Sequence, residues 1–283
     1  MNTHPSSFVD ASSRALARTK ESIDRFGGRL AGSEACRKTA ESLRIEFERV
    51  CGNGVLEPFT THPGAFTRFY QIDIGLYVIG LTLLFFGQPL AAGLVLLFMA
   101  SAAGLQFGWY VEFYDCLYPQ ETCYNLSAVL EPRGNFVRQL IFSGHHDSAN
   151  ELKFLKKNQK LYGLKIVVPD FFRLLALTFA WVWVGWRAIT GADPYFGPYV
   201  LALLIPGTYF VFTKFFLFEP WAVPGAGDNL IASAMLVELA QTLRDPAHPG
   251  HSFLDNTRLI FASFDAEESG LRGSRAWVKT QEK

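Results

Sequence analysis

The feature that most constrains this chain is a run without any charged side chain from Ile74 to Val111. A helix needs about 20 residues to cross the hydrocarbon layer of a membrane, so this run is long enough for two crossings. The segment Gly87-Gln88-Pro89 lies midway and predicts the turn between them, because proline ends a helix. The alternative is a long buried hairpin in a soluble protein, but soluble helices nearly always carry a polar face. The sequence therefore predicts a transmembrane hairpin over residues 69–111.

A second apolar block covers residues 171–218 and contains Gly191-Ala192-Asp193-Pro194, which predicts another turn. Arg173, Arg187 and Lys214 lie near the ends of its two halves, where long side chains can reach the membrane interface. Apolar residues make up 49% of the chain, and their concentration in two blocks favours membrane spans over an enlarged core. We therefore expect a multi-pass integral membrane protein in contact with the lipid bilayer.

Composition excludes other classes. The formal net charge is zero, so nothing indicates nucleic acid as a partner. Residues 1–20 are polar and lack the apolar core of a secretory signal. The four cysteines, Cys36, Cys51, Cys116 and Cys123, have no CxxC spacing. We expect free thiols, with a Cys116–Cys123 disulfide as the alternative.

Regular patterns surround the two apolar blocks. Residues 8–25 form an amphipathic pattern, and Ser33 is the expected N-cap of a second helix that ends at Gly52. Strands are predicted over residues 55–59, 126–130, 137–142 and 258–264, and further helices over 228–243 and 273–279. The second and third strands are separated by Glu131-Pro132-Arg133-Gly134-Asn135, which predicts a tight turn between them.

This order of elements predicts an α/β fold, a partial doubly wound sheet interrupted by two transmembrane helical hairpins. The domain would comprise residues 1–68, 112–170 and 219–283, and the hairpins residues 69–111 and 171–218. Each hairpin returns the chain to the side it left, so all three domain segments would lie on one side of the bilayer.

The charges that flank the hairpins predict which side this is. The domain-side flanks carry Arg68, Arg173, Lys214 and the lysine cluster at 153–165. The opposite turns carry only Arg187, offset by Asp193. Because positively charged flanks stay inside, we expect a cytoplasmic domain.

His145 lies in the first candidate ligand segment, Gly144-His145-His146-Asp147-Ser148. The segment follows a predicted strand, and ligands gather at the carboxyl ends of strands in open α/β sheets. Zinc takes imidazole nitrogen and carboxylate oxygen. His145 is the expected ligand and His146 the register alternative, while Asp147 could hold a ligating ring in one tautomer. Taken alone, such a triplet is more often structural.

Two carboxylate segments complete the candidate site. Asp228 lies in Gly225-Ala226-Gly227-Asp228-Asn229 before a predicted helix, where an isolated Asp is usually an N-cap. Glu267 and Glu268 follow a predicted strand, where an isolated pair is usually solvated. Three glycine-flanked loops that all carry His or carboxylate favour a zinc hydrolase, with one glutamate on the metal and its neighbour moving protons.

In this order, three motifs resemble those of the co-catalytic dizinc aminopeptidases. The motifs are His145-His146-Asp147-Ser148, Gly225-Ala226-Gly227-Asp228-Asn229 and Ala266-Glu267-Glu268-Ser269-Gly270-Leu271-Arg272-Gly273-Ser274. These enzymes form the twenty-eighth metallopeptidase family, which also includes glutamate carboxypeptidases. Residues 29–33 and 125–130 are similar to the family's opening pattern. The resemblance covers most of the soluble part and none of the apolar blocks.

The resemblance implies two Zn²⁺ ions and a role for each motif residue. His145 would bind one zinc with Asp147 behind it, and Asp228 would bridge both ions. Glu268 would bind a zinc, and Glu267 would be the general base. The implied reaction is hydrolysis of an N-terminal peptide bond of a peptide substrate, in which Glu267 passes a proton from water to the leaving amine.

The chain departs from the family pattern at two places. A membrane hairpin separates the histidine from the bridging aspartate. The family also needs an Asp and a distant His after the paired glutamates, and residues 269–283 contain neither. Two expected metal ligands are therefore missing, and we expect the sequence to be a C-terminally truncated part of a longer enzyme. No pattern in it indicates an oligomeric state.

Two other functions fit parts of the sequence. A peptidase-like membrane protein without activity, acting as a binding module, would account for the missing ligands but not for the retained Glu267, Glu268 and His145. An enzyme like the zinc glutaminyl cyclases would keep the metal and change the reaction. The leading prediction is a membrane-bound zinc peptidase, specifically an aminopeptidase.

Overall fold

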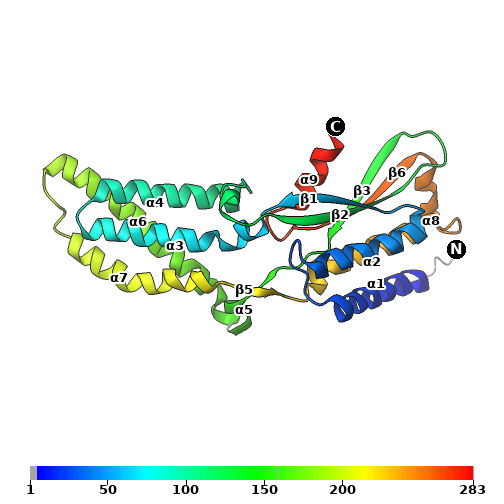
Figure 1. Ribbon diagram of the computed structural model, residues 1–283, viewed down its shortest axis with the longest axis horizontal. Coiled ribbons are helices and arrows are strands. Elements are labelled where there is room, and N and C mark those ends of the chain that lie inside the picture. Colours follow the sequence, from blue (N-terminus) through cyan, green and yellow to red (C-terminus); the bar gives the residue numbers. More distant parts are fainter. Residues whose placement is uncertain (1–4, 158, 283) are drawn as a thin grey trace. The chain divides into compact units, whose positions relative to one another are not determined.

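A computed structural model describes residues 5–157 and 159–282 of the chain (Figure 1). The chain divides into two compact units. Unit 1 comprises Met1–Pro63, Pro119–Asn150 and Trp221–Lys283, and unit 2 comprises Gly64–Tyr118 and Glu151–Pro220. Residues 151–170 thus group with the apolar helices, whereas the sequence pattern assigns them to the soluble domain.

Unit 1 is built on a four-stranded mixed sheet in the order β1-β2-β6-β3. The strands are β1 (Val55–Thr61), β2 (Glu121–Leu130), β3 (Arg138–His145) and β6 (Thr257–Phe264). β2 runs antiparallel to both β1 and β6, and β3 runs parallel to β6. The α/β class is as predicted, but only the β3–β6 pair has the parallel arrangement of a doubly wound sheet.

The tight turn predicted between β2 and β3 does not join neighbouring strands, because β6 lies between them. The connecting segment instead bonds to the loop before β6, where the Arg133 N–H donates to the Leu254 carbonyl and the Val137 N–H to that of Asn256. β6 is buried along nearly its whole length. A central place in the sheet covers both of its faces, which a β2–β3 hairpin would not do.

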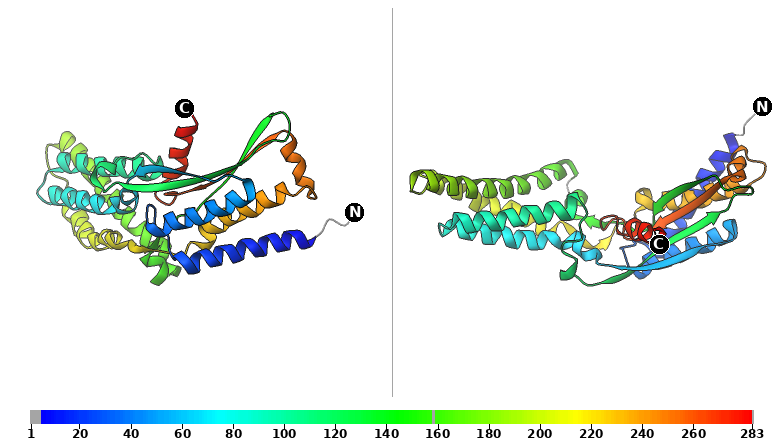
Figure 2. Two further views of the ribbon diagram at one scale, coloured as in Figure 1. Left: turned by 45° about the vertical axis from the view of Figure 1, so that its right-hand side comes forward. Right: turned by 90° about the horizontal axis from the view of Figure 1, so that it is seen from above.

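Helices cover both faces of the unit 1 sheet (Figure 2). They are α1 (Pro5–Phe26), α2 (Glu34–Cys51), α8 (Ile231–Arg244) and α9 (Arg272–Gln281). On one face Phe47 of α2 and Val237 of α8 pack with Phe261 of β6. On the other, Trp277 of α9 packs against Ile260 of β6. Fully burying one such apolar side chain contributes about 1.5–3 kcal/mol, so these two cores hold the sheet in place.

The start and end of α2 follow the predicted capping residues. The Ser33 hydroxyl accepts a hydrogen bond from the Cys36 backbone N–H at 3.2 Å, which satisfies one of the free donors of the first turn. Gly52 ends the helix with φ +77°, in the left-handed region that glycine adopts without strain. The first turn of α2 is thereby fixed next to the loop that begins at Arg29.

Unit 2 consists mainly of four long apolar helices. They are α3 (Pro63–Phe85), α4 (Pro89–Ala103), α6 (Tyr162–Thr190) and α7 (Gly197–Thr213). With their flanking helical turns, all four segments are long and apolar enough to cross a membrane. Gly87 and Gly191 lie in the two predicted turns, both with positive φ. The first and third helices begin earlier than expected, at Pro63 and Tyr162. The short helix α5 (Lys153–Lys157) precedes α6, and β4 (Asn150–Leu152) pairs with β5 (Phe218–Ala222).

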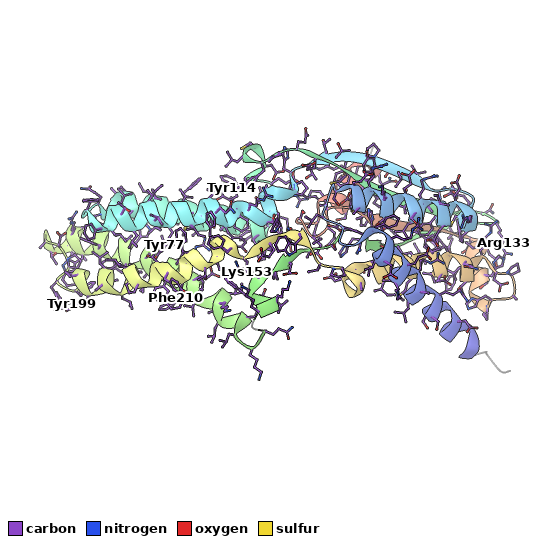
Figure 3. The ribbon with its side chains drawn as sticks, turned by 60° about the horizontal axis from the view of Figure 1, so that its bottom comes forward. Tyr77, Tyr114, Arg133, Lys153, Tyr199 and Phe210 are labelled. Atoms are coloured by element: carbon purple, nitrogen blue, oxygen red, sulfur yellow. The ribbon has the colours of Figure 1, made fainter. Side chains whose placement is uncertain are left out.

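A polar cluster links three helical segments inside unit 2. Asp73 of α3 is buried, accepts a hydrogen bond from the Tyr114 hydroxyl at 3.0 Å and pairs with Arg173 of α6 at 2.6 Å. Asp170 of α6 contacts both Arg173, at 3.0 Å, and Lys214 after α7, at 2.6 Å. Tyr114 lies at one end of the helical unit, and Tyr199 of α7 at the other (Figure 3). The cluster therefore lies toward the end of unit 2 that Tyr114 marks.

Candidate metal and catalytic site

The three candidate ligand segments meet at one edge of the unit 1 sheet. β3 and β6 run in parallel, and their register pairs His145 with Phe264, so the residues after each strand leave from the same edge. The segment after β3 carries His146 and Asp147, and the segment after β6 carries the glutamate pair. Asp228 reaches the same edge from the turn Ala226–Leu230, which precedes α8.

His145 is the centre of this arrangement. Its Nε2 lies 3.3 Å from the Oδ1 of Asp228 and 3.4 Å from the Oε2 of Glu267. One ligand atom each of His145, Asp228 and Glu268 lie within 4.8 Å of one another. The imidazole is buried, whereas 81% of the Asp228 side chain is exposed, so the cluster opens toward solvent. The structure thus brings together the three residues that the sequence predicts as metal ligands.

Asp147 connects the end of β3 with the loop after β6 through two side-chain contacts. Its Oδ1 lies 3.0 Å from the Nδ1 of His145, and its Oδ2 accepts a hydrogen bond from the Glu268 N–H at 3.1 Å. The carboxylate is completely buried. Because a carboxylate only accepts, it favours a proton on His145 Nδ1 and leaves Nε2 to face Asp228 and Glu267.

Electrostatics at this edge favour a bound cation. Burial alone would lower the pKa of His145, but Asp147, Glu267 and Glu268 outweigh it and raise that pKa to about 9. Burial, followed by the charges of Asp147 and Asp228, raises the pKa of Glu268 to about 7. Burial likewise raises the pKa of Glu267. Several carboxylates are thus held together at an energetic cost that a divalent cation would offset, and the nitrogen and oxygen donors suit zinc.

Arg29 positions the loops that carry His145 and Asp228, a role that the sequence pattern does not reveal. Its completely buried guanidinium donates to the carbonyls of His146 (2.7 Å), Pro224 (2.9 Å) and Gly225 (3.1 Å). Its backbone N–H also donates to the Ser148 hydroxyl at 2.9 Å. A buried charge persists only when its donors are satisfied, so Arg29 fixes both loops at once. The only signal in the sequence is an arginine in a short glycine-containing loop.

Asn125 and Gly273 support the loop that carries the glutamate pair, a role that the sequence analysis does not predict. The Asn125 side chain donates to the Gly273 carbonyl at 2.8 Å and accepts from the Asp265 N–H at 3.2 Å. A Cβ on Gly273 would lie 1.9 Å from the Asp265 carbonyl oxygen, so only glycine fits there. These contacts hold the loop of the glutamate pair against β2.

His146 and Asp228 also differ from their simplest sequence interpretations. His146 turns away from Asp228 and bonds through Nδ1 to the Ser263 hydroxyl at 3.0 Å, and burial lowers its pKa to about 3. Asp228 is not an N-cap, because Leu230, two residues further along the chain, holds the N-cap position of α8. The peptide bond between Asp228 and Asn229 is cis.

Part of the chain is similar to a known family. Residues 211–283 match the family model described as Peptidase family M28, the family that the sequence motifs resemble. The matched segment contains Asp228, Glu267 and Glu268. No curated protein matches the chain.

Two solved structures are similar to this chain at 13% sequence identity. The glutaminyl cyclase of Fimbriiglobus ruber aligns with 95% of this chain and 54% of its own, with a TM-score of 0.46. An aminopeptidase from Aneurinibacillus sp. strain AM-1 aligns with 95% of this chain and 67% of its own, with a TM-score of 0.40. The chain therefore spans about half the length of the glutaminyl cyclase.

Proposed function

We propose that this chain belongs to a membrane-bound, zinc-dependent aminopeptidase. The observation that carries the proposal is the convergence of His145, Asp228 and Glu268 ligand atoms within 4.8 Å, with Glu267 3.4 Å from the same histidine nitrogen. The match of residues 211–283 to the Peptidase family M28 model supports hydrolysis of a peptide bond.

The proposed ligand residues have distinct tasks. His145, Asp228 and Glu268 would hold zinc, and the exposed Asp228 carboxylate would be a ligand at the solvent side of the cluster. Zinc bound there supplies a Lewis acid, which lowers the pKa of water and polarises a peptide carbonyl. Asp147 keeps the His145 ring oriented, so that Nε2 faces Asp228 and Glu267 and would be the nitrogen that binds the metal.

Glu267 is the proposed general base. It is partly buried, and burial raises its pKa, which makes the carboxylate a better proton acceptor than an exposed glutamate. In hydrolysis it would remove a proton from the attacking water and pass it to the leaving amine. Glu268, its neighbour in the chain, has a carboxylate oxygen close to the ligand atoms of His145 and Asp228, so it is proposed as a metal ligand.

The proposed setting is a lipid bilayer crossed by the four helices of unit 2. Their length and apolar composition support this setting. The basic residues beside the hairpins support a cytoplasmic location for unit 1. The proposed substrates are peptides.

The test is an assay of the detergent-purified protein with two substrates, an aminoacyl anilide and a peptide that begins with glutamine. We expect anilide hydrolysis that is lost on chelation and restored by zinc. Glu267→Gln should lower the rate by about 10²–10⁴, as expected for loss of a general base, whereas Glu282→Gln on the exposed end of α9 should not. Ring closure of the glutamine peptide without anilide hydrolysis would show that the reaction is wrongly assigned. No activity with either substrate in the zinc-loaded protein would favour a binding function.

A further inference from the structure

A second cluster of metal-ligating side chains lies in unit 1 apart from the candidate catalytic ligands. It consists of Cys36 in the first turn of α2, His146 after β3 and Asp265 after β6. All three residues are completely buried. One ligand atom from each lies within 4.8 Å of the other two. None of the three has a role in the proposed reaction.

The hydrogen bonds around His146 determine which of its two ring nitrogens carries the proton. Ser233 Oγ lies 3.0 Å from the His145 carbonyl, to which it can only donate. Ser263 Oγ, 2.7 Å from Ser233 Oγ, must then donate to Ser233. The Ser263 oxygen is left to accept from His146 Nδ1 at 3.0 Å, so the ring proton is on Nδ1.

The Nε2 of His146 is therefore a bare lone pair. It is buried and has no hydrogen-bond partner among the described residues. A buried acceptor without a hydrogen-bond partner lowers the stability of the folded protein by about 1–3 kcal/mol. A lone pair on Nε2, with Nδ1–H bonded to an oxygen, is also the arrangement of a histidine that binds a metal.

The other two residues supply the ligand types that match this nitrogen. Cys36 Sγ lies 3.3 Å from Asp265 Oδ1. The carboxylate also accepts from the backbone N–H groups of Tyr124 at 3.1 Å and Ala266 at 2.7 Å, which are neutral donors. Zinc bonds of about 2.0–2.3 Å place the donors of one ion within about 4 Å of each other. The ligand atoms of Cys36, His146 and Asp265 have a similar spacing, within 4.8 Å of one another.

We propose that Cys36, His146 and Asp265 bind one zinc ion, at a site separate from the candidate catalytic centre. Binding would release the Cys36 thiol proton to solvent, and the ion would take its place beside Asp265. A divalent ion with one thiolate and one carboxylate is neutral overall, which suits a completely buried position. The ion would join the start of α2 to the ends of β3 and β6, directly behind the candidate catalytic loops.

Cobalt substitution distinguishes this site from the catalytic one, because only the proposed new site contains sulfur. Chelated protein would be reloaded with Co²⁺ and its absorption recorded. We expect a near-ultraviolet thiolate-to-cobalt charge-transfer band in a background that carries Cys51→Ser and Cys116→Ser. Adding Cys36→Ser or His146→Gln should remove or shift the band. Cys51 lies at the other end of α2, so the background itself controls for loss of a cysteine from this helix.

Alkylation of Cys36 in the wild-type protein tests the same site without depending on the folding of a variant. Zinc-loaded and chelated protein would be treated with an alkylating agent, and modification of Cys36 followed by mass spectrometry. We expect chelation to increase the alkylation rate of Cys36 at least several-fold and to leave Cys51 unchanged. Absence of the charge-transfer band in cobalt-loaded protein, its persistence unchanged after Cys36→Ser, or equal alkylation of Cys36 in both states would overturn the proposal. Peptidase activity is assayed separately, so failure here leaves the proposed function standing.

Discussion

At the scale of single residues, the candidate site depends on side chains and glycines that bind nothing themselves. Arg29 connects the two loops that present His145 and Asp228, and Gly225 allows those loops to approach each other. Gly225 has φ +56°, and a Cβ there would lie 2.5 Å from the Cβ of Ser148. A side chain at this position would thus meet both a backbone penalty and a steric one.

Gly225→Ala should destabilise the protein and disturb the site. The left-handed backbone and the contact with Ser148 together predict a loss of about 1–3 kcal/mol, measured by thermal or denaturant unfolding. Zinc content should fall in parallel. Gly227→Ala, two residues along the same loop, has open space around its Cβ and should match the wild type. Equal stability of the two variants would show that the loop is not packed as described.

Cys51 gives a prediction about pH. Burial raises the pKa of this thiol to about 11, above its ordinary value of 9.0. The folded state therefore favours the neutral thiol, so this contribution to stability is complete below pH 9 and is lost as pH rises through 11. Alkylation of native Cys51 should speed up about tenfold per pH unit between pH 8 and 10, measured by mass spectrometry. A rate that levels off near pH 9 would mean that the thiol is not shielded.

At the scale of elements, the polar cluster of unit 2 holds helices together within an apolar environment. Asp73 of α3 and Arg173 of α6 form its most enclosed ion pair, and only 1% of the Asp73 side chain is exposed. Removing Asp73 would leave Arg173 with the half-exposed Asp170 as its remaining ion-pair partner, so its charge would be only partly compensated.

Asp73→Ala should therefore lower stability in detergent by about 1.5–3 kcal/mol, read from thermal unfolding, because Asp170 still compensates part of the Arg173 charge. The double variant Asp73→Ala/Arg173→Met should recover part of this loss, because it removes the incompletely paired guanidinium. Asp193→Ala removes an exposed partner of Arg187 in the same unit and should change stability little, because water screens exposed ion pairs. If Asp73→Ala behaved like Asp193→Ala, the pair would contribute nothing to helix association.

Local patterns predicted the elements well because their causes are local. Ser33 and Gly52 limit α2 as expected, and Gly87 and Gly191 lie in the turns between apolar helices. The partners of β2 could not be predicted in the same way. A short polar segment between two strands favours a hairpin, but the burial of β6 from distant sequence places it between them.

The sequence predicts the ligands of the candidate site, but it does not predict the residues that hold those ligands in position. His145 and His146 are adjacent and chemically identical, and only the register of β3 with β6 turns His145 toward Asp228 and His146 toward Ser263. The role of Arg29 arises from contacts with carbonyls more than 100 positions away, which no local motif encodes.

At the scale of the whole molecule, the proposed topology has both hairpins returning the chain to one side of a membrane. The cysteine introduced by Ala192→Cys, in the Asp193 turn, should react with an impermeant maleimide added to intact cells. Ser252→Cys, exposed in unit 1, should react only after permeabilisation. Both would be placed in a background carrying Cys51→Ser and Cys116→Ser. Labelling of Ser252→Cys in intact cells together with protection of Ala192→Cys would reverse the proposed orientation.

The proposed mechanism assigns different tasks to two adjacent glutamates: Glu268 binds zinc and Glu267 transfers the proton. The most direct test measures zinc content and anilide hydrolysis for Glu267→Gln and Glu268→Gln, both in a Cys36→Ser background so that only the candidate catalytic metal is counted. Glu267→Gln should retain zinc and lose activity, whereas Glu268→Gln should lose both. Retained activity in Glu267→Gln, or unchanged zinc content in Glu268→Gln, would contradict the assignment.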